Sequence, residues 1–302
     1  MSRYDTVVVG IDGSDVARDA LHWAADEAHL RGSRLLVAHA DDLPRVAADP
    51  YQPGVRPVAQ ILRAEAVAAA TARHPDLVCE AVLCHGDAAQ TLIDLSACAD
   101  LLVVGTHRLG RQRGFVLGSV SQRVAAHAAC PVVTVSGPQE ETSGPLVLGA
   151  STSPGGLAAL RFACEEARLR GVPIRAIRAA TAVDWTTGGP GHPPAISFEG
   201  LERAAQAELD AVIAEAARQF PDVRIEDARS TADVFTALQV EAATASLVVL
   251  GARHDTATAL AHLGPVAAWL LHQAQCPLAI VAGPRSSTID AEVLDSVAVA
   301  PV

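Results

Sequence analysis

The sequence predicts an α/β protein built from two copies of one domain, each a parallel sheet with helices on both faces. Short apolar runs of strand length alternate along the chain with longer segments that have helical periodicity, and the same landmarks recur in both halves. The length of 302 residues is about twice that of a typical domain. Hydrophobic residues make up 50% of the chain but aromatic residues only 3%, so the cores must consist of Ala, Val and Leu.

The elements of the first half follow one another in regular alternation. The apolar run Val7-Val8-Val9 predicts a buried strand, and the apolar positions between Ala20 and Leu30 predict the helix after it. The next helix should stop before Pro75. The remaining expected strands are 34–39, 78–83, 101–104 and 132–135, and the remaining helices are 58–73, 88–98 and 119–128. Strands alternating with helices in this way predict a parallel sheet covered on both faces.

Matched landmarks define the repeat. Gly32 recurs as Gly171, 139 positions later, whereas Cys130 recurs as Cys276, 146 positions later. The second copy therefore has seven extra residues, which we place in the proline-rich segment between its second strand and second helix. We expect a first domain at 1–138, a linker at 139–144, a second domain at 145–284 and a tail at 285–302.

The composition argues against several classes of protein. With a net charge of −11 and only 23 Lys and Arg residues, the chain lacks the cationic surface that binds nucleic acids or anionic membranes. No apolar run reaches the roughly 20 residues of a membrane span. The six cysteines form no CxxC pair and read as buried thiols of a reducing compartment. We expect a cytoplasmic protein.

A nucleotide site is predicted where the first and fourth strands of the first half end. Doubly wound sheets bind ligands beyond the carboxyl ends of their strands, where the strand order reverses. The first strand leads to a carboxylate suited to ribose or adenine donors, and the helix after Gly118 offers amides and hydroxyls to phosphates. The candidate binding residues are Ile11, Asp12, Gly105, Gly118, Ser119, Val120 and Ser121.

These motifs make both halves resemble universal stress protein domains. The start Val-Gly-Ile-Asp-Gly-Ser, the strand Leu-Leu-Val-Val-Gly, Leu117-Gly118-Ser119-Val120-Ser121 and the closing Cys-Pro-Val-Val all resemble the family, whose ATP-binding members carry G-x2-G-x9-G-[S/T]. The resemblance implies a five-stranded Rossmann-like fold of the adenine nucleotide alpha hydrolase type, with strand order 3-2-1-4-5. It also implies pairing of the two domains within the chain, and ATP or AMP as ligand, with Mg²⁺ and with Ala40 near the adenine.

The first copy departs from the family motif at one position, where Arg108 stands in place of the second glycine. If the backbone there is left-handed, arginine costs about 1 kcal/mol or more relative to glycine. Alternatively, the guanidinium of Arg108 lies on a phosphate. We therefore include Arg108 among the candidate binding residues.

The second copy departs at three positions. Ser151 replaces Asp12, His254 replaces Arg108, and Pro265 replaces Ser119. Proline has neither a hydroxyl nor an amide hydrogen. We expect the second copy not to bind ATP in the same way.

Each candidate residue also has a purely structural explanation. Ser119 with Gln122 fits a capping box, Pro265 suits the first turn of a helix, and Asp12 with Ser14 fits a turn that supplies a helix cap. The sequence has no G-x-G-x-x-G after the first strand, no P-loop and no histidine spacing of the zinc type.

We expect a nucleotide-binding regulator of the stress response rather than an enzyme. A nucleotide-free scaffold and a slow ATPase are the alternatives, and the second would need a positioned base that the sequence does not reveal. The edge strands 132–135 and 278–281 allow homodimerisation, or could cover each other within one chain.

Overall fold

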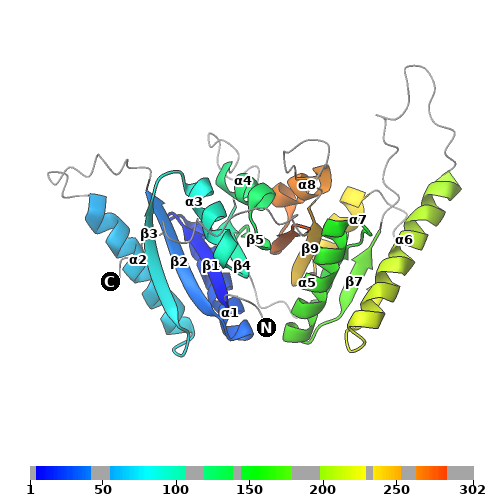
Figure 1. Ribbon diagram of the computed structural model, residues 1–302, viewed down its shortest axis with the longest axis horizontal. Helices are drawn as coiled ribbons and strands as arrows, with labels where there is room; N and C mark the ends of the chain where they lie inside the picture. The colour runs from blue at the N-terminus through cyan, green and yellow to red at the C-terminus, as the bar shows by residue number, and fades with distance from the viewer. Residues whose placement is uncertain are drawn as a thin grey trace, which may run out of the picture. The chain divides into compact units, whose positions relative to one another are not determined.

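The computed structural model describes residues 5–41, 55–106, 119–138, 144–178, 198–228, 234–252 and 263–283. These residues form two compact units, one within 5–138 and the other within 144–283, coloured blue to green and green to red in Figure 1. The expected tail at 285–302 and linker positions 139–143 lie outside the described residues. Each unit is described by itself.

The first unit has the alternating order expected of it. Its five strands are all parallel and pair in the order β3-β2-β1-β4-β5, which confirms the expected order 3-2-1-4-5. The elements are β1 (Thr6–Ile11), α1 (Asp15–Arg31), β2 (Arg34–Asp41), α2 (Val55–Arg73), β3 (Cys79–His85), α3 (Ala88–Leu95), the 3-10 turn η2 (Ser96–Cys98), β4 (Leu101–Gly105), α4 (Ser119–His127) and β5 (Val132–Val135).

The second unit repeats the topology. Its strands are also parallel and pair in the order β8-β7-β6-β9-β10, the same order counted within the copy. The elements are β6 (Leu146–Gly149), α5 (Pro154–Arg170), β7 (Ile174–Ile177), α6 (Phe198–Gln219), β8 (Ile225–Asp227), α7 (Val234–Ala242), β9 (Leu247–Gly251), α8 (Pro265–Gln273) and β10 (Leu278–Val281).

Matched caps begin and end the first helix of each unit. The Ser14 hydroxyl accepts a hydrogen bond from the N–H of Ala17 at the start of α1, and Ser153 caps α5 in the same way. Both helices end at a left-handed glycine, Gly32 with φ 65° and Gly171 with φ 66°. The equivalent turns therefore hold the two helices at equivalent places.

The helix expected over 88–98 is shorter than predicted. It ends at Leu95, and η2 covers 96–98. The Ser96 hydroxyl donates to the carbonyl oxygen of Ile93 at 2.5 Å and accepts from the N–H of Ala129 at 2.7 Å. A serine that bonds nearby backbone competes with the helical pattern, and this accounts for the tightened end.

The core of each unit consists of apolar strands covered by alanine-rich helices. Val7, Val8 and Val9 of β1 are at most 1% exposed, as expected of a strand buried on both faces. Among the described residues, each unit also buries one carboxylate: Glu27 pairs with Arg31 at 2.5 Å, and Glu166 pairs with Arg170 at the same distance. A buried carboxylate requires such a partner.

The cysteines follow the prediction only in part. Cys130, Cys164 and Cys276 are buried, whereas Cys79, Cys84 and Cys98 are half-buried, and all six are free thiols. Burial raises the pKa of Cys130 and of Cys164 to about 12 and that of Cys79 to about 11. These three sulfurs are therefore thiols rather than reactive thiolates at neutral pH. In the described part of the chain, no helix combines the length and apolar character of a membrane span.

Candidate functional site

Gly105 brings the end of β4 against the start of α1. A Cβ atom at this position would lie 2.7 Å from the carbonyl oxygen of Val16 and 3.0 Å from the nitrogen of Ala17. Only glycine fits without a backbone shift. Strands β1 and β4 are also paired neighbours in the sheet. The loop after β1 therefore lies beside the end of β4.

The loop after β1 presents an exposed carboxylate. Asp12 Oδ1 accepts a hydrogen bond from the N–H of Ser14 at 2.9 Å, so the residue has the turn role that the sequence allowed. Asp12 nevertheless stays exposed, and Ile11 beside it is half-buried. The turn therefore orients the carboxylate without covering it.

Ala40 lies at the same edge of the sheet. It is half-buried near the end of β2 and pairs with Cys84 of β3, while its neighbour His39 pairs with Ile11 of β1. The Nδ1 atom of His39 lies 2.9 Å from the carbonyl oxygen of Ile11. Because β2, β1 and β4 are adjacent and parallel, the structure brings Ile11, Asp12, Ala40 and Gly105 to one carboxyl edge.

The first turn of α4 supplies the remaining described candidates. Ser119 begins the helix, although its side chain lies outside the description, and Val120 is half-buried. Ser121 is 3% exposed, and its hydroxyl donates to Thr106 Oγ1 at 3.3 Å. The side chain of Ser121 therefore points into the protein rather than toward a ligand. Arg108 and Gly118 lie outside the described residues.

The second unit has a cleft at the equivalent edge. It lies between the ends of β6, β7 and β9 and the starts of α5, α7 and α8, and its space together with the solvent at its mouth is about 680 Å³. Gly251 closes β9 as Gly105 closes β4, since a Cβ there would lie 2.5 Å from the carbonyl carbon of Gly155. The backbone of the predicted site is therefore present in the second copy as well.

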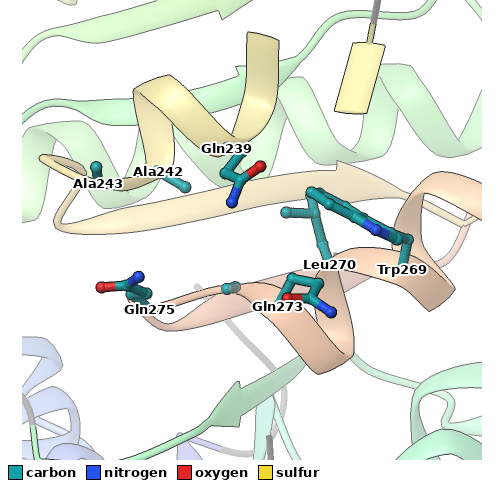
Figure 2. A pocket seen from close by; sticks show the side chains of 8 residues that line it. Gln239, Ala242, Ala243, Trp269, Leu270, Gln273 and Gln275 are labelled. Atoms are coloured by element: carbon teal, nitrogen blue, oxygen red, sulfur yellow. The ribbon is translucent and has the colours of Figure 1, made fainter. Parts of the chain in front are cut away.

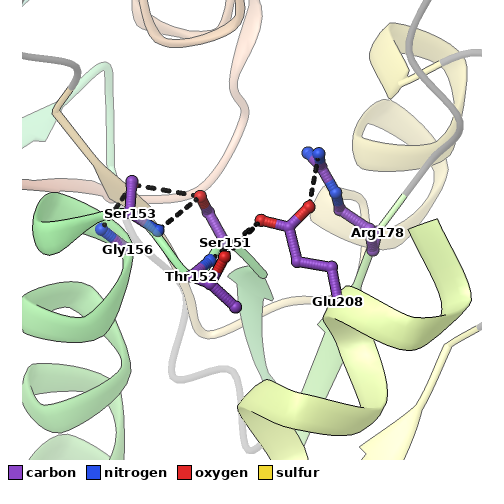
Figure 3. A network of polar contacts seen from close by, with 6 residues as sticks. All are labelled: Ser151, Thr152, Ser153, Gly156, Arg178 and Glu208. Carbon is purple, nitrogen blue, oxygen red and sulfur yellow. Dashed lines mark hydrogen bonds and ion pairs between the residues drawn. The ribbon is translucent and has the colours of Figure 1, made fainter. Parts of the chain in front are cut away.

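A polar network that the motifs did not reveal lies beside this cleft (Figure 3). Glu208 Oε1 accepts from the N–H of Thr152 at 2.9 Å and from its hydroxyl at 3.1 Å, and Oε2 lies 2.6 Å from Arg178 Nη2. Ser151 takes over the turn role of Asp12, because its hydroxyl accepts from the N–H of Ser153 at 3.2 Å. Burial alone would raise the pKa of Glu208, but the Thr152 hydrogen bonds and the charge of Arg178 lower it.

Aligning the two copies gives only a weak signal for this network. The offset of 146 places Glu208 opposite Leu62, and the offset of 139 places Arg178 opposite His39. Both positions change from an uncharged or weakly basic residue to a fully charged one. Other carboxylates of α6 also lie opposite uncharged residues of the first copy, so this change alone does not single out Glu208.

A smaller hollow of about 290 Å³ lies at the far ends of α7 and α8 (Figure 2). Gln239, Gln273 and Gln275 line it together with Trp269, which packs edge-on against Phe235 at 5.3 Å. None of the described residues that line it is charged. It therefore lacks the groups that would bind a phosphate.

Comparison with known proteins agrees with this architecture. The model of the universal stress protein family matches residues 3–136 and 144–282. A universal stress protein of Mycobacterium tuberculosis H37Rv is 30% identical over 290 residues, covering 91% of this chain and 95% of its own.

A solved structure with the same fold covers most of the chain. A universal stress protein from Archaeoglobus fulgidus has a TM-score of 0.71 at 15% identity, covering 93% of this chain and 99% of its own. A shorter universal stress protein, solved in complex with cAMP, is 31% identical, with a TM-score of 0.36, and covers 45% of this chain and 98% of its own. With both halves matched by its model, the chain belongs to the universal stress protein family.

Proposed function

We propose that the first unit binds ATP or a related adenine nucleotide and that the protein acts as a nucleotide-responsive regulator of the stress response. One observation carries the proposal. At the carboxyl edge of this unit, an exposed carboxylate on Asp12 follows β1, and the paired strand β4 ends at Gly105, which lies close against the start of α1. Such an edge suits a ligand that combines hydroxyl donors with phosphates.

Each residue at this edge would contact a different part of the nucleotide. Asp12 would accept hydrogen bonds from ribose hydroxyls, while Ile11 and Ala40 would flank the adenine. The first-turn N–H groups of a helix have no partner within the helix, and α4 begins at Ser119 beyond the end of β4. That turn would bind the phosphates, with Gly118 and Arg108 completing the loop before it.

Mg²⁺ would be held mainly by the phosphates of the nucleotide, as is usual for this cation. We propose binding rather than turnover, because hydrolysis needs a positioned base and the sequence offers no such group. A bound nucleotide regulates a protein only if it binds two conformations with different affinity. The regulatory role therefore requires ATP to favour one conformation of the first unit.

Calorimetric titration of the nucleotide-stripped protein with ATP and Mg²⁺ tests the proposal. We expect about one site per chain, lost in Asp12→Ala and retained in the matched variant Ser151→Ala, because both residues accept the same turn hydrogen bond and only Asp12 carries a charge. Two sites per chain would show that the second unit also binds ATP. No heat at millimolar ATP would favour the nucleotide-free scaffold.

Two further variants separate the alternatives. A gain in affinity on Arg108→Gly would show that the arginine obstructs the pocket, whereas a loss would assign its guanidinium to a phosphate. If the protein releases phosphate from ATP faster than a Ser119→Ala, Ser121→Ala double variant does, the slow ATPase would be favoured over the regulator.

A further inference from the structure

An ion pair joins the helices α3 and α4 of the first unit. Arg123 Nη1 of α4 lies 2.9 Å from Asp87 Oδ2, and Asp87 is the residue that caps the start of α3. The two helices pack against each other (Figure 1). Arg123 follows Ser119, the first residue of α4, by about one turn. The pair therefore holds α4 close to the end that we propose to face the phosphates.

The carboxylate of Asp87 is fixed in place by a second contact. Its other oxygen, Oδ1, accepts a hydrogen bond from the N–H of Gln90 at 2.8 Å, which caps α3. The hydrogen bonds from Arg123 and from Gln90 lower the pKa of Asp87 below its usual value, so the group is ionised at neutral pH. Arg123 is therefore held by a charge whose position α3 determines.

The loop that carries Asp87 is tied to the strand beside the proposed adenine position. The N–H of Gly86 donates to the carbonyl oxygen of Asp41 at 2.8 Å, and Gly86 has φ 119°, a conformation that favours glycine. Asp41 directly follows Ala40 in β2, and its Oδ1 lies 2.5 Å from His85 Nδ1. The contacts thus run without a break from Asp41 to α4.

Two contacts on nearly opposite sides of α4 fix how the helix is turned. The Ser121 hydroxyl donates to Thr106, directly after β4, and Arg123 reaches Asp87 at the start of α3. Positions two residues apart in an α-helix point about 200° apart around its axis. Loss of either contact would let the first turn of the helix shift relative to the end of β4.

An aromatic contact stands at the place of this ion pair in the second unit. The offset of 146 places Trp269 opposite Arg123, and Asp233, opposite Asp87, lies outside the described residues. Trp269, labelled in Figure 2, packs edge-on against Phe235 with the ring centroids 5.3 Å apart. The charged anchor of the helix is thus absent from the described part of the copy that we expect not to bind ATP.

We propose that Asp87 and Arg123 are positioning residues for nucleotide binding in the first unit. The pair would hold the first turn of α4 where its N–H groups meet the phosphates, without Arg123 itself touching the ligand. This inference rests on the function proposed for the first unit. It adds two residues outside the glycine motif on which the affinity for ATP depends.

Calorimetric titration of the nucleotide-stripped, full-length protein with ATP and Mg²⁺ tests the pair. Asp87→Asn keeps the cap of α3, because asparagine caps as well as aspartate does, and removes only the charge. Arg123→Gln removes the other charge. We expect each variant to weaken ATP binding about threefold, the size of effect that an exposed ion pair has. The double variant should weaken it no further, because the same pair is lost only once.

Direct contact between Arg123 and a phosphate predicts a different result. Asp87→Asn would then free the guanidinium for the ligand and tighten ATP binding instead of weakening it. Arg123→Lys keeps a positive charge beside Asp87, so this conservative variant should restore most of the affinity that Arg123→Gln loses.

Thermal denaturation without nucleotide separates positioning from a purely structural role. An exposed ion pair contributes little to stability, so the Tm of each variant should stay within about 2 °C of that of the unmodified protein.

Arg73→Gln is the matched control for the titration. It breaks an ion pair with Asp26 that joins α1 and α2, and the four side chains of the two pairs are between 42% and 56% exposed. Both residues lie toward the C-terminal ends of their helices, away from the carboxyl edge of the sheet. Arg73→Gln should therefore leave the affinity for ATP unchanged.

Each outcome bears on a different claim. If the unmodified protein binds no ATP, the proposed function fails and this inference fails with it. If the protein binds ATP and neither variant weakens binding, the inference alone is wrong. Tighter binding by Asp87→Asn would make Arg123 a phosphate ligand, and a Tm that falls together with the affinity would reduce the pair to a structural contact. If Arg123→Gln does not fold, the result for Asp87→Asn decides.

Discussion

The carboxyl edges of the two units share a backbone and differ in chemistry. A Cβ atom added to Gly105 would lie 2.7 Å from the carbonyl oxygen of Val16, and one added to Gly251 would lie 2.5 Å from the carbonyl carbon of Gly155. Each first helix is capped by a serine at the matched position, Ser14 or Ser153. The positions that set helix against strand are therefore kept in both copies.

The side chains that face a ligand or support the loops have changed. The buried hydroxyl pair Thr106 and Ser121 of the first unit corresponds to Ala252 and Ala267, both buried, in the second. Packing constrains the backbone of both copies because a shift there disturbs the whole sheet, whereas a loop side chain can change without that cost.

The contact below the first loop has changed as well. A Cβ on Gly13 would lie 3.2 Å from Leu62 Cδ2, so these two residues pack together in the first unit. The equivalent residues of the second unit, Thr152 and Glu208, are hydrogen-bonded. An apolar contact in the first unit has thus become a contact with a charged side chain in the second.

The largest expected effect comes from filling the shared backbone contact. Gly105→Ala and Gly251→Ala should each lower the free energy of unfolding by about 3 kcal/mol, because the added methyl group meets backbone atoms that cannot move aside cheaply. Urea denaturation measures this. Gly32→Ala is the control: it has a left-handed φ but no atom within 4 Å, and should cost about 1 kcal/mol. Equal costs at all three sites would show that the contact is not tight.

An intermediate effect is expected from the hydroxyl pair that only the first unit has. Thr106→Ala and Ser121→Ala should each destabilise the protein by about 1 kcal/mol, and the double variant by less than their sum, because one hydrogen bond is lost only once. A double-mutant cycle from urea unfolding measures the coupling. Strict additivity would mean that the 3.3 Å contact contributes nothing to stability.

The smallest effect is the pH dependence that comes from Glu208, whose matched residue in the first unit, Leu62, does not titrate. Burial would raise the pKa of Glu208, but the Thr152 hydrogen bonds and the charge of Arg178 outweigh it, so the pKa is lowered in the folded protein. The ionised carboxylate of Glu208 therefore contributes its full stabilisation above the unfolded pKa of about 4.3. It is lost as the pH falls through the lowered folded pKa. The difference in unfolding free energy between the protein and Glu208→Gln should therefore shrink on acidification.

Urea unfolding at a series of pH values, from neutral to acidic, measures that difference. Leu62→Gln alters the matched position of the first unit without adding a titratable group, so its effect should not change over this range. If the difference for Glu208→Gln stays constant, the ion pair between Glu208 and Arg178 does not contribute to the stability of the protein.

Local signals determined most of the fold and part of the site. Alternating apolar runs, the capping serines and the glycines at strand ends predict the element order, and the position of Asp12 after the first strand predicts its place at the carboxyl edge. These features act within a few residues of the chain. They can therefore be read without knowing what packs against them.

Only the tertiary structure decided which side chains meet at each edge. The motif containing Ser121 suggested a surface hydroxyl, but the rotation of α4 about its own axis turns that hydroxyl toward Thr106. Glu208 lies 56 positions from Thr152, and nothing in α6 distinguishes it from the other carboxylates of that helix. Such contacts depend on how a helix docks on a sheet, which is set by packing over the whole unit rather than by local sequence.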